Sequence, residues 1–162
     1  HSTAKLSIRL PESGNLHGYW NLDKYFDLKG YSKYVSRSNK DILSQIKNSS
    51  LCVCTQNTTV FLQTLSINFP TIAFWNKDLN EIAPEARPYI DLLVEAEILF
   101  YSPERAAEKV NAVGNNIEEW WFSNKVQSAR SEFCERFAFS SENWLDEWSE
   151  FFSSKKESYE YL

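Results

Sequence analysis

The residues from Ser50 to Trp75 constrain the fold of this chain more than any other stretch. Their sequence, SLCVCTQNTTVFLQTLSINFPTIAFW, predicts a strand, a polar loop, a helix, a proline turn and a second strand. The two strand segments, 51–55 and 71–75, carry no charge, which is typical of strands buried on both faces of a parallel sheet. Two such strands joined by a helix predict a βαβ unit with helices covering the sheet.

The same alternation continues on both sides of this unit. Further strands are predicted at 5–10, 31–36 and 98–101. Helices are predicted from Ser38 with Ser38 as its cap, from Thr58, from Pro88 and from Pro103, the last capped by Ser102 and ended by Gly114. Later segments read as helical at 116–138, with an interruption near Ser123, and at 141–153.

These elements predict an α/β fold. We expect a Rossmann-like three-layer domain with about five parallel strands, followed by about two or three C-terminal helices. Residues 1–114 would form the Rossmann-like nucleotide-binding half, and residues 115–155 would form helices that pack on it or on a missing N-terminal domain. Residues 156–162 read as a frayed tail.

Composition narrows the classes of function. The formal net charge of −5 argues against nucleic acid as a main partner. No apolar run approaches the roughly 20 residues that span a bilayer, and the start HSTAKLSIRLP lacks the apolar core of a signal peptide. We therefore expect a cytoplasmic protein with no transmembrane segment, and leave peripheral association of the full protein with a membrane open.

Cysteine and histidine are scarce. Cys52 and Cys54 share one face of a predicted strand, and Cys134 lies in a predicted helix. We interpret all three as small buried hydrophobic residues in a reducing compartment. With His1 and His17 as the only histidines, no metal site is expected. The absence of methionine, even at position 1, suggests an excised domain or a processed product.

Functional groups of a parallel sheet gather where the strands end. Here these positions are Arg9, the loop 55–59, Trp75 with Asn76, and Tyr101 with Ser102. They contain hydrogen-bond donors and one arginine but no histidine, no carboxylate pair and no nucleophile beside a base. This profile predicts an anion-binding surface suited to a phosphate or diphosphate. Neither GxxxxGK[ST] nor GxGxxG occurs, which disfavours an ATPase or a dinucleotide enzyme.

Each candidate also has a structural interpretation. Asn57 or Thr58 could serve only as a helix cap, and capping and phosphate binding use the same geometry. Arg9 could be a surface ion-pair partner, and Trp75 could simply cover the core. Tryptophans in the last third are more often packing residues, or a docking face for another domain, than a ligand box.

The segment LCVCTQNTTVFLQTLSINFPTIAFW resembles the nucleotide-binding half of glycosyltransferases of the two-domain GT-B type. Most of the chain is similar to the C-terminal part of a family of bacterial transferases associated with surface-carbohydrate synthesis, and CDP-glycerol glycerophosphotransferases are more distant relatives of the same architecture. The matching pieces are IRL, the GYW near Gly18, TTVFLQTLSINFPTIAFWN, ARPYIDLL, SPERAAEKVN, IEEWW and VQSAR…FCERFA.

The resemblance implies a metal-independent transferase that uses a nucleotide-activated donor and needs no cofactor. It implies that the diphosphate is held by Arg9, Gln56, Asn57, Thr58 and Thr59. It also implies that the base or ribose is flanked by Gln63, Trp75, Asn76, Tyr101 and Ser102.

Two features depart from the family. Related sequences commonly have glutamate at the helix position occupied here by Gln63, where it can contact the ribose hydroxyls. The N-terminal Rossmann-like domain, which supplies most of the acceptor site and usually the catalytic base, is absent from this chain. The chain alone is therefore expected to bind weakly and to be inactive, and its catalytic residues stay unassigned.

Two functions lead among those that the sequence predicts, and a third, a stand-alone small α/β enzyme, is disfavoured by the shortage of acid–base residues. The first is a donor-binding domain of a glycosyltransferase-like enzyme of surface polysaccharide synthesis. The alternative is a non-catalytic α/β interaction module that has lost donor binding and docks a partner through its aromatic helices. A nucleoside diphosphate should bind in the first case and not in the second.

Overall fold

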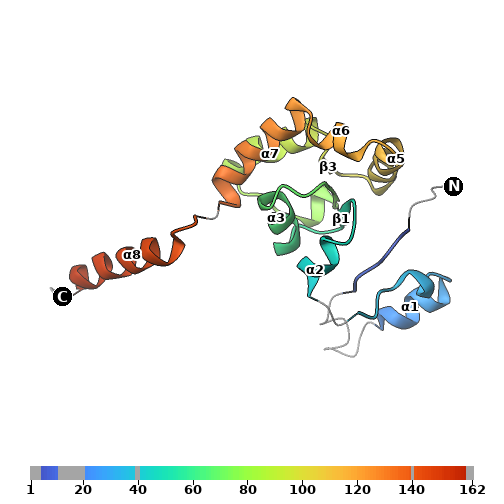
Figure 1. Ribbon diagram of the computed structural model, residues 1–162, viewed down its shortest axis with the longest axis horizontal. Helices are drawn as coiled ribbons and strands as arrows, with labels where there is room; N and C mark the ends of the chain where they lie inside the picture. Colours follow the sequence, from blue (N-terminus) through green and yellow to red (C-terminus); the bar gives the residue numbers. More distant parts are fainter. Residues whose placement is uncertain (1–4, 11–20, 39–40, 140, 160–162) are drawn as a thin grey trace. The chain divides into compact units, whose positions relative to one another are not determined.

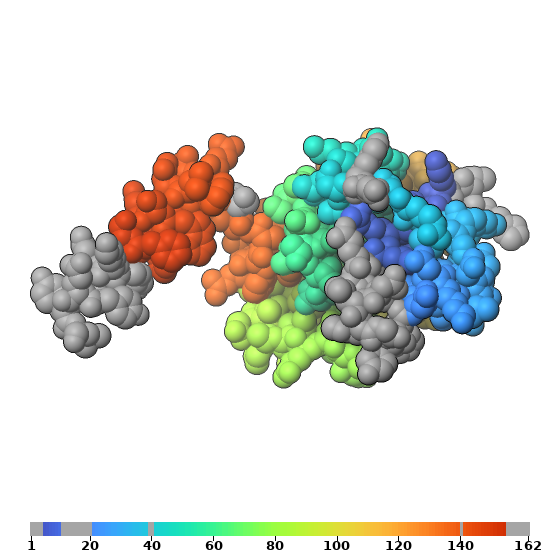
Figure 2. All heavy atoms as spheres, turned by 90° about the horizontal axis from the view of Figure 1, so that it is seen from below, coloured from blue at the N-terminus to red at the C-terminus, as the bar shows by residue number. Residues whose placement is uncertain are grey.

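The computed structural model describes residues 5–10, 21–38, 41–139 and 141–159 of the 162-residue chain, with side chains described up to residue 154. The chain divides into two compact units, His1–Ser49 and Ser50–Leu162, and each is described separately. Figure 2 colours the first unit in blue and cyan, and the second from turquoise to red. His17 and Gly18, which the sequence analysis singled out, lie outside the described residues.

The described residues of the first unit form two short α-helices with side-chain caps. In α1 (Leu22–Leu28), Asn21 Oδ1 accepts a hydrogen bond from the Lys24 amide at 2.8 Å. In α2 (Ile42–Ile46), Asp41 Oδ1 accepts one from the Ser44 amide at 2.9 Å. The prediction that Ser38 caps this second helix is therefore wrong. Asp41 takes that place because its carboxylate also accepts from the Ser44 hydroxyl at 2.6 Å.

The predicted strands 5–10 and 31–36 meet in a single parallel bridge between Ile8 and Val35. The Ile8 amide donates to the Tyr34 carbonyl at 2.7 Å, and the Ser36 amide donates to the Ile8 carbonyl at 2.8 Å. The second segment starts instead as a 3₁₀ helix, η2 (Ser32–Tyr34), which follows Gly30 in a left-handed conformation, φ 74°. Local hydrogen bonds in this turn occupy backbone groups that a longer strand would offer.

The second unit contains the sheet. Its strands β1 (Cys52–Cys54), β2 (Thr71–Phe74) and β3 (Leu99–Phe100) are parallel in the order β1-β2-β3. Cys54 pairs with Ala73, and Ala73 pairs with Leu99. The last three of the five predicted strands are thus confirmed as a parallel sheet. The described residues form a mixed α/β fold with three strands in this sheet rather than five.

As the sequence predicts, an α-helix lies between each pair of consecutive strands of this sheet, and the other helices follow the last strand. The described helices of this unit are α3 (Thr59–Ser66), α4 (Arg87–Glu95), α5 (Pro103–Val113), α6 (Ile117–Trp121), α7 (Asn124–Phe137) and α8 (Trp144–Tyr159), with 3₁₀ turns η3 (Lys77–Leu79) and η4 (Pro84–Ala86) between β2 and α4. The interruption predicted near Ser123 is confirmed, because Ser123 separates α6 from α7. Gly114 ends α5, also as predicted.

Two layers of helices cover the sheet (Figure 1). On one face, α3 packs on β1 and β2, α4 packs on β3, and α7 packs on both helices. Phe61, Leu65, Leu93 and Trp121 are fully buried in this layer. On the other face, α5 packs on β2 and β3, with Ile72 and Ala106 at the centre of a smaller cluster. This layer leaves Val53 of β1 exposed.

A polar network joins α6 and α7 to the end of α3. Asn68 follows α3 and adopts a left-handed backbone conformation, φ 54°. Its Oδ1 accepts a hydrogen bond from the Trp121 indole N–H at 2.9 Å. Gln127 Nε2 donates to the same oxygen at 3.1 Å. Arg130 Nη1 donates to the Leu65 carbonyl at 3.0 Å, where a cation is favoured by the negative end of the helix dipole. These bonds fix the carboxyl end of α3.

The last helix differs from the rest of the second unit. α8 carries large apolar side chains that are exposed, among them Trp148 at 53% and Phe152 at 62%. These two rings stack with centroids 5.4 Å apart. No helix within the described ranges is both long and apolar enough to cross a bilayer.

Candidate functional site

The three strands of the second unit end at one edge of the sheet, because they are parallel and adjacent. This carboxyl edge is formed by the loop 55–58 after β1, by Trp75 and Asn76 after β2, and by Tyr101 and Ser102 after β3. The structure therefore brings together the three loops of the second unit that the sequence analysis selected. Ligands of open α/β sheets bind at this edge.

The amino end of α3 is an open part of this edge. Gln56, Asn57, Thr58 and Thr59 are all exposed. Thr58 is the N-cap residue in an extended conformation, φ −131° and ψ 172°, but its side chain makes no capping hydrogen bond. The first hydrogen bonds of the helix run from the Phe61 and Leu62 amides to the Thr58 carbonyl. The amides of Thr59 and Val60 come before these bonds and have no acceptor within the helix. Such amides, with the helix dipole, favour an anion.

Trp75 lies in the core and not on the surface of this edge. Its side chain is 4% exposed, and its ring meets Phe61 edge-to-face at 5.3 Å. The burial supports the interpretation that Trp75 covers the core. Its indole Nε1, however, is buried and has no hydrogen-bond partner among the described residues. A buried unsatisfied donor is costly, and such a group often marks a bound water or ligand.

Asn76 and Ser102 are engaged in local capping. Asn76 Oδ1 accepts from the Asp78 amide at 2.8 Å and so caps η3. Ser102 Oγ accepts from the Arg105 amide at 3.3 Å and donates to Glu104 Oε2 at 2.5 Å. The hydrogen bond from Ser102 lowers the pKa of the Glu104 carboxyl. The Asn76 side chain therefore stabilises the 3₁₀ turn after β2, and the Ser102 side chain stabilises the start of α5 after β3.

Lys77 is a cation that the sequence analysis did not select. Its Nζ lies 5.3 Å from the centroid of the Tyr101 ring, so it links the residues that follow β2 and β3. Burial, and then the nearby Asp91 carboxylate, raise the pKa of the Tyr101 hydroxyl. The sequence could have indicated Lys77 only by its position, because Lys77 is the first charged residue after β2.

Two predicted site residues lie elsewhere. Gln63 is half-buried on α3, one turn beyond Thr59. Arg9 is half-buried in the first unit, next to Ile8 of the parallel bridge, and its part in this site stays a prediction. Within the described ranges, no three His, Cys, Asp or Glu side chains gather into a group that could hold a metal ion.

Comparison with known proteins identifies a family. A family model described as LIC12162 family transferase matches residues 4–152, a range that contains the strands and helices of the described residues up to the first half of α8. No curated protein and no solved structure matches the chain.

Proposed function

Because this chain belongs to the LIC12162 family of transferases, we propose that it binds the nucleotide-diphosphate donor of a glycosyltransferase-like reaction. The donor would lie along the carboxyl edge of the sheet. The full protein would have the two-domain GT-B architecture and act in surface polysaccharide synthesis, as the resemblance in the sequence implies. The five-stranded Rossmann-like layout belongs to the same proposal, and the parallel Ile8–Val35 bridge supports it.

The open amino end of α3 carries this proposal. It combines an exposed polar loop, a helix without a side-chain cap and a position at the end of a parallel strand. The oxygen atoms of a diphosphate would accept hydrogen bonds from the first amides of α3 and from the hydroxyls of Thr58 and Thr59. The helix has no acidic residue in its first turn that would repel an anion.

Residues after β2 and β3 would supply the rest of the donor site. Lys77 is exposed and can exchange its contact with the Tyr101 ring for a phosphate oxygen. The unpartnered Trp75 indole N–H supplies a buried donor at the end of β2. Gln63 would hydrogen-bond the ribose hydroxyls without the charge of the glutamate that is common in related sequences.

The described sheet edge offers positioning groups rather than a proton-transfer pair. We therefore propose that the acceptor site and the catalytic base come from an N-terminal domain beyond this chain, and that the chain alone is inactive. Neither a metal ion nor a further cofactor takes part in this scheme.

Titration of the chain with nucleoside diphosphates tests the proposal. We expect the backbone amide NMR signals of residues 56–60 to shift with a diphosphate and to shift far less with the matching nucleoside. Lys77→Ala should weaken binding about tenfold, the loss of one charge-assisted phosphate contact, and Thr58→Val should weaken it less. No shift at millimolar concentration with any of the common nucleoside diphosphates would overturn the proposal.

Lys125→Ala is the matched control. Lys125 is also exposed, but it stands in the first turn of α7, whose Gln127 binds the carboxyl end of α3. The Lys125→Ala variant loses the same charge as Lys77→Ala, but far from the open amino end of α3. We expect this variant to bind the diphosphate with the affinity of the unaltered chain.

The exposed aromatic side chains of α8 favour a second function. Trp144, Trp148 and Phe152 are each more than half exposed, as expected of a face that docks a partner. In this alternative the chain is a non-catalytic interaction module and binds no donor. The same titration separates the two functions, because the module predicts no nucleotide-dependent shift in residues 56–60.

A further inference from the structure

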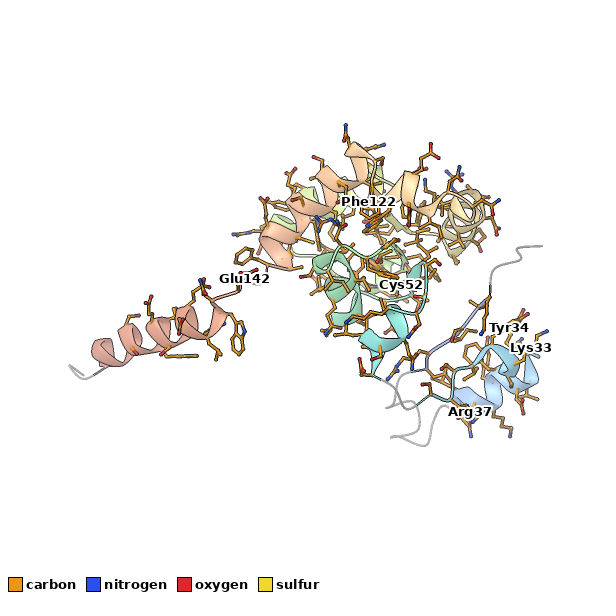
Figure 3. All side chains as sticks on the ribbon, viewed as in Figure 1. Lys33, Tyr34, Arg37, Cys52, Phe122 and Glu142 are labelled. Carbon is orange, nitrogen blue, oxygen red and sulfur yellow. The ribbon has the colours of Figure 1, made fainter. Side chains whose placement is uncertain are left out.

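Cys52 and Cys54 form a close pair of thiols on β1. They lie on the same face of the strand, the face covered by α3, and their sulfur atoms are 3.9 Å apart. This distance allows an S–H···S hydrogen bond. Figure 3 labels Cys52 on the strand beside α3. The next residue after the pair is Thr55, where the loop to α3 begins.

The two thiols occupy different environments. Cys54 is buried, with 6% of its surface exposed, whereas Cys52 is half-buried. The hydrogen bond from Cys54 lowers the pKa of Cys52, and the same bond together with burial raises the pKa of Cys54. A partly exposed thiol with a stabilised thiolate next to a buried thiol is the arrangement of an attacking and a resolving cysteine.

A bond between them requires the strand to bend. Alternate residues on one face of a strand are about 6.6 Å apart at both Cα and Cβ, whereas the Cβ atoms of a disulfide lie about 3.5–4.5 Å apart. β1 contains three residues, and a short strand bends more easily than a long one. A disulfide that bends the strand is strained and readily reduced, which suits a reversible modification rather than a structural crosslink.

We propose that Cys52 and Cys54 form a redox-active dithiol that exchanges with low-molecular-weight disulfides such as oxidised glutathione. The Cys52 thiolate attacks one sulfur of the glutathione disulfide, and the first glutathione leaves as a thiolate. Cys54 then loses its proton to solvent and attacks Cys52 Sγ. The second glutathione leaves as a thiolate, so the protein loses two electrons and one glutathione disulfide becomes two thiols.

This inference is independent of donor binding. It rests on the geometry of two side chains and not on the identity of any substrate. Cys134 provides an internal comparison, because it is a buried thiol on α7 without a neighbouring thiol in the described structure. Burial raises the pKa of Cys134, which opposes reaction.

Incubation of the chain with oxidised glutathione, followed by acid quenching, alkylation and tryptic digestion, tests the proposal. Cleavage at Lys47 and Lys77 places both cysteines of the pair in one peptide, and cleavage at Arg130 and Arg136 isolates Cys134. Mass spectrometry should show peptide 48–77 lighter by two hydrogens and without alkyl groups. Peptide 131–136 should remain fully alkylated, and dithiothreitol should reverse the change.

Variants identify the role of each thiol. Cys54→Ser should stop at the mixed disulfide, with glutathione on Cys52. Cys52→Ser should leave Cys54 unmodified, because the remaining thiol is buried. Full alkylation of peptide 48–77 in the unaltered protein, a stable glutathione adduct there, or equal oxidation of Cys134 would each overturn the proposal.

Discussion

The amino ends of α3 and α5 stand at the same edge of the same sheet but are stabilised in different ways. Ser102 caps α5 with one hydrogen bond from the Arg105 amide, and a second bond from its hydroxyl holds the Glu104 carboxylate near the positive end of the helix. Thr58 makes no such cap for α3. Instead, Phe61 in the first turn of α3 is fully buried against Trp75 and Phe133.

This difference shows how a helix can keep its amino end free. In the first turn of α5, the Ser102 side chain accepts a hydrogen bond from a helix amide, and an added anion would be repelled by the Glu104 carboxylate. The first turn of α3 is stabilised by the aromatic packing of Phe61, and no side chain occupies its first amides. In α3, therefore, packing takes the place of side-chain capping and leaves the amino end open to a ligand.

Phe61→Ala removes the packing that holds α3 and should have the largest effect. We expect the free energy of unfolding to fall by about 3–5 kcal/mol, because a large aromatic side chain is lost from a close-packed core. Urea denaturation followed by circular dichroism measures the change. Phe122→Ala is the control, since Phe122 is exposed and should cost little. Similar losses for the two variants would contradict the role given to Phe61.

Ser102→Ala and Thr58→Ala compare the two caps directly. Ser102→Ala should lower the free energy of unfolding by about 1 kcal/mol, because the Arg105 amide loses its acceptor. Thr58→Ala should change it by no more than about 0.3 kcal/mol, because no capping bond is lost. Thermal denaturation of both variants in one buffer provides the measurement. Equal destabilisation would mean that Thr58 caps α3 in solution.

Thr58→Asp should make α3 resemble α5. A carboxylate at this position can accept hydrogen bonds from the first amides of α3. We expect the free energy of unfolding to rise by about 0.5–1 kcal/mol. The same carboxylate would occupy the proposed anion site, so affinity for a nucleoside diphosphate should fall while stability rises. A variant that is more stable and binds the diphosphate as well as before would separate the site from the end of α3.

The response to pH should differ between the two helix ends, and this effect is the smallest. The pKa of Glu104 is lowered in the folded chain by its bond to Ser102. The resulting stabilisation is present above the usual pKa of 4.5 and is lost as the pH falls through the lowered value. The first turn of α3 contains no titratable group. An NMR titration of Glu104 should show the lowered pKa, and Ser102→Ala should raise it.

The sequence predicts the elements whose signals are local. The uncharged strands, the helix from Thr58 to before Pro70, the Ser102 cap with Pro103 and the break at Ser123 all appear in the structure. The strands predicted at 5–10 and 31–36 reduce to one bridge. Alternation of side chains alone did not reveal the turn at Ser32–Tyr34, which depends on Gly30 and on local hydrogen bonds.

The sequence by itself determined the order of strands and helices, and with it the set of loops that meet at one edge, because periodicity and turn residues act over a few neighbours. Tertiary structure alone decided that Trp75 is buried, that Lys77 reaches Tyr101 and that the Thr58 side chain leaves α3 uncapped. These properties depend on which distant side chains pack together, and neither local propensity nor spacing specifies that packing.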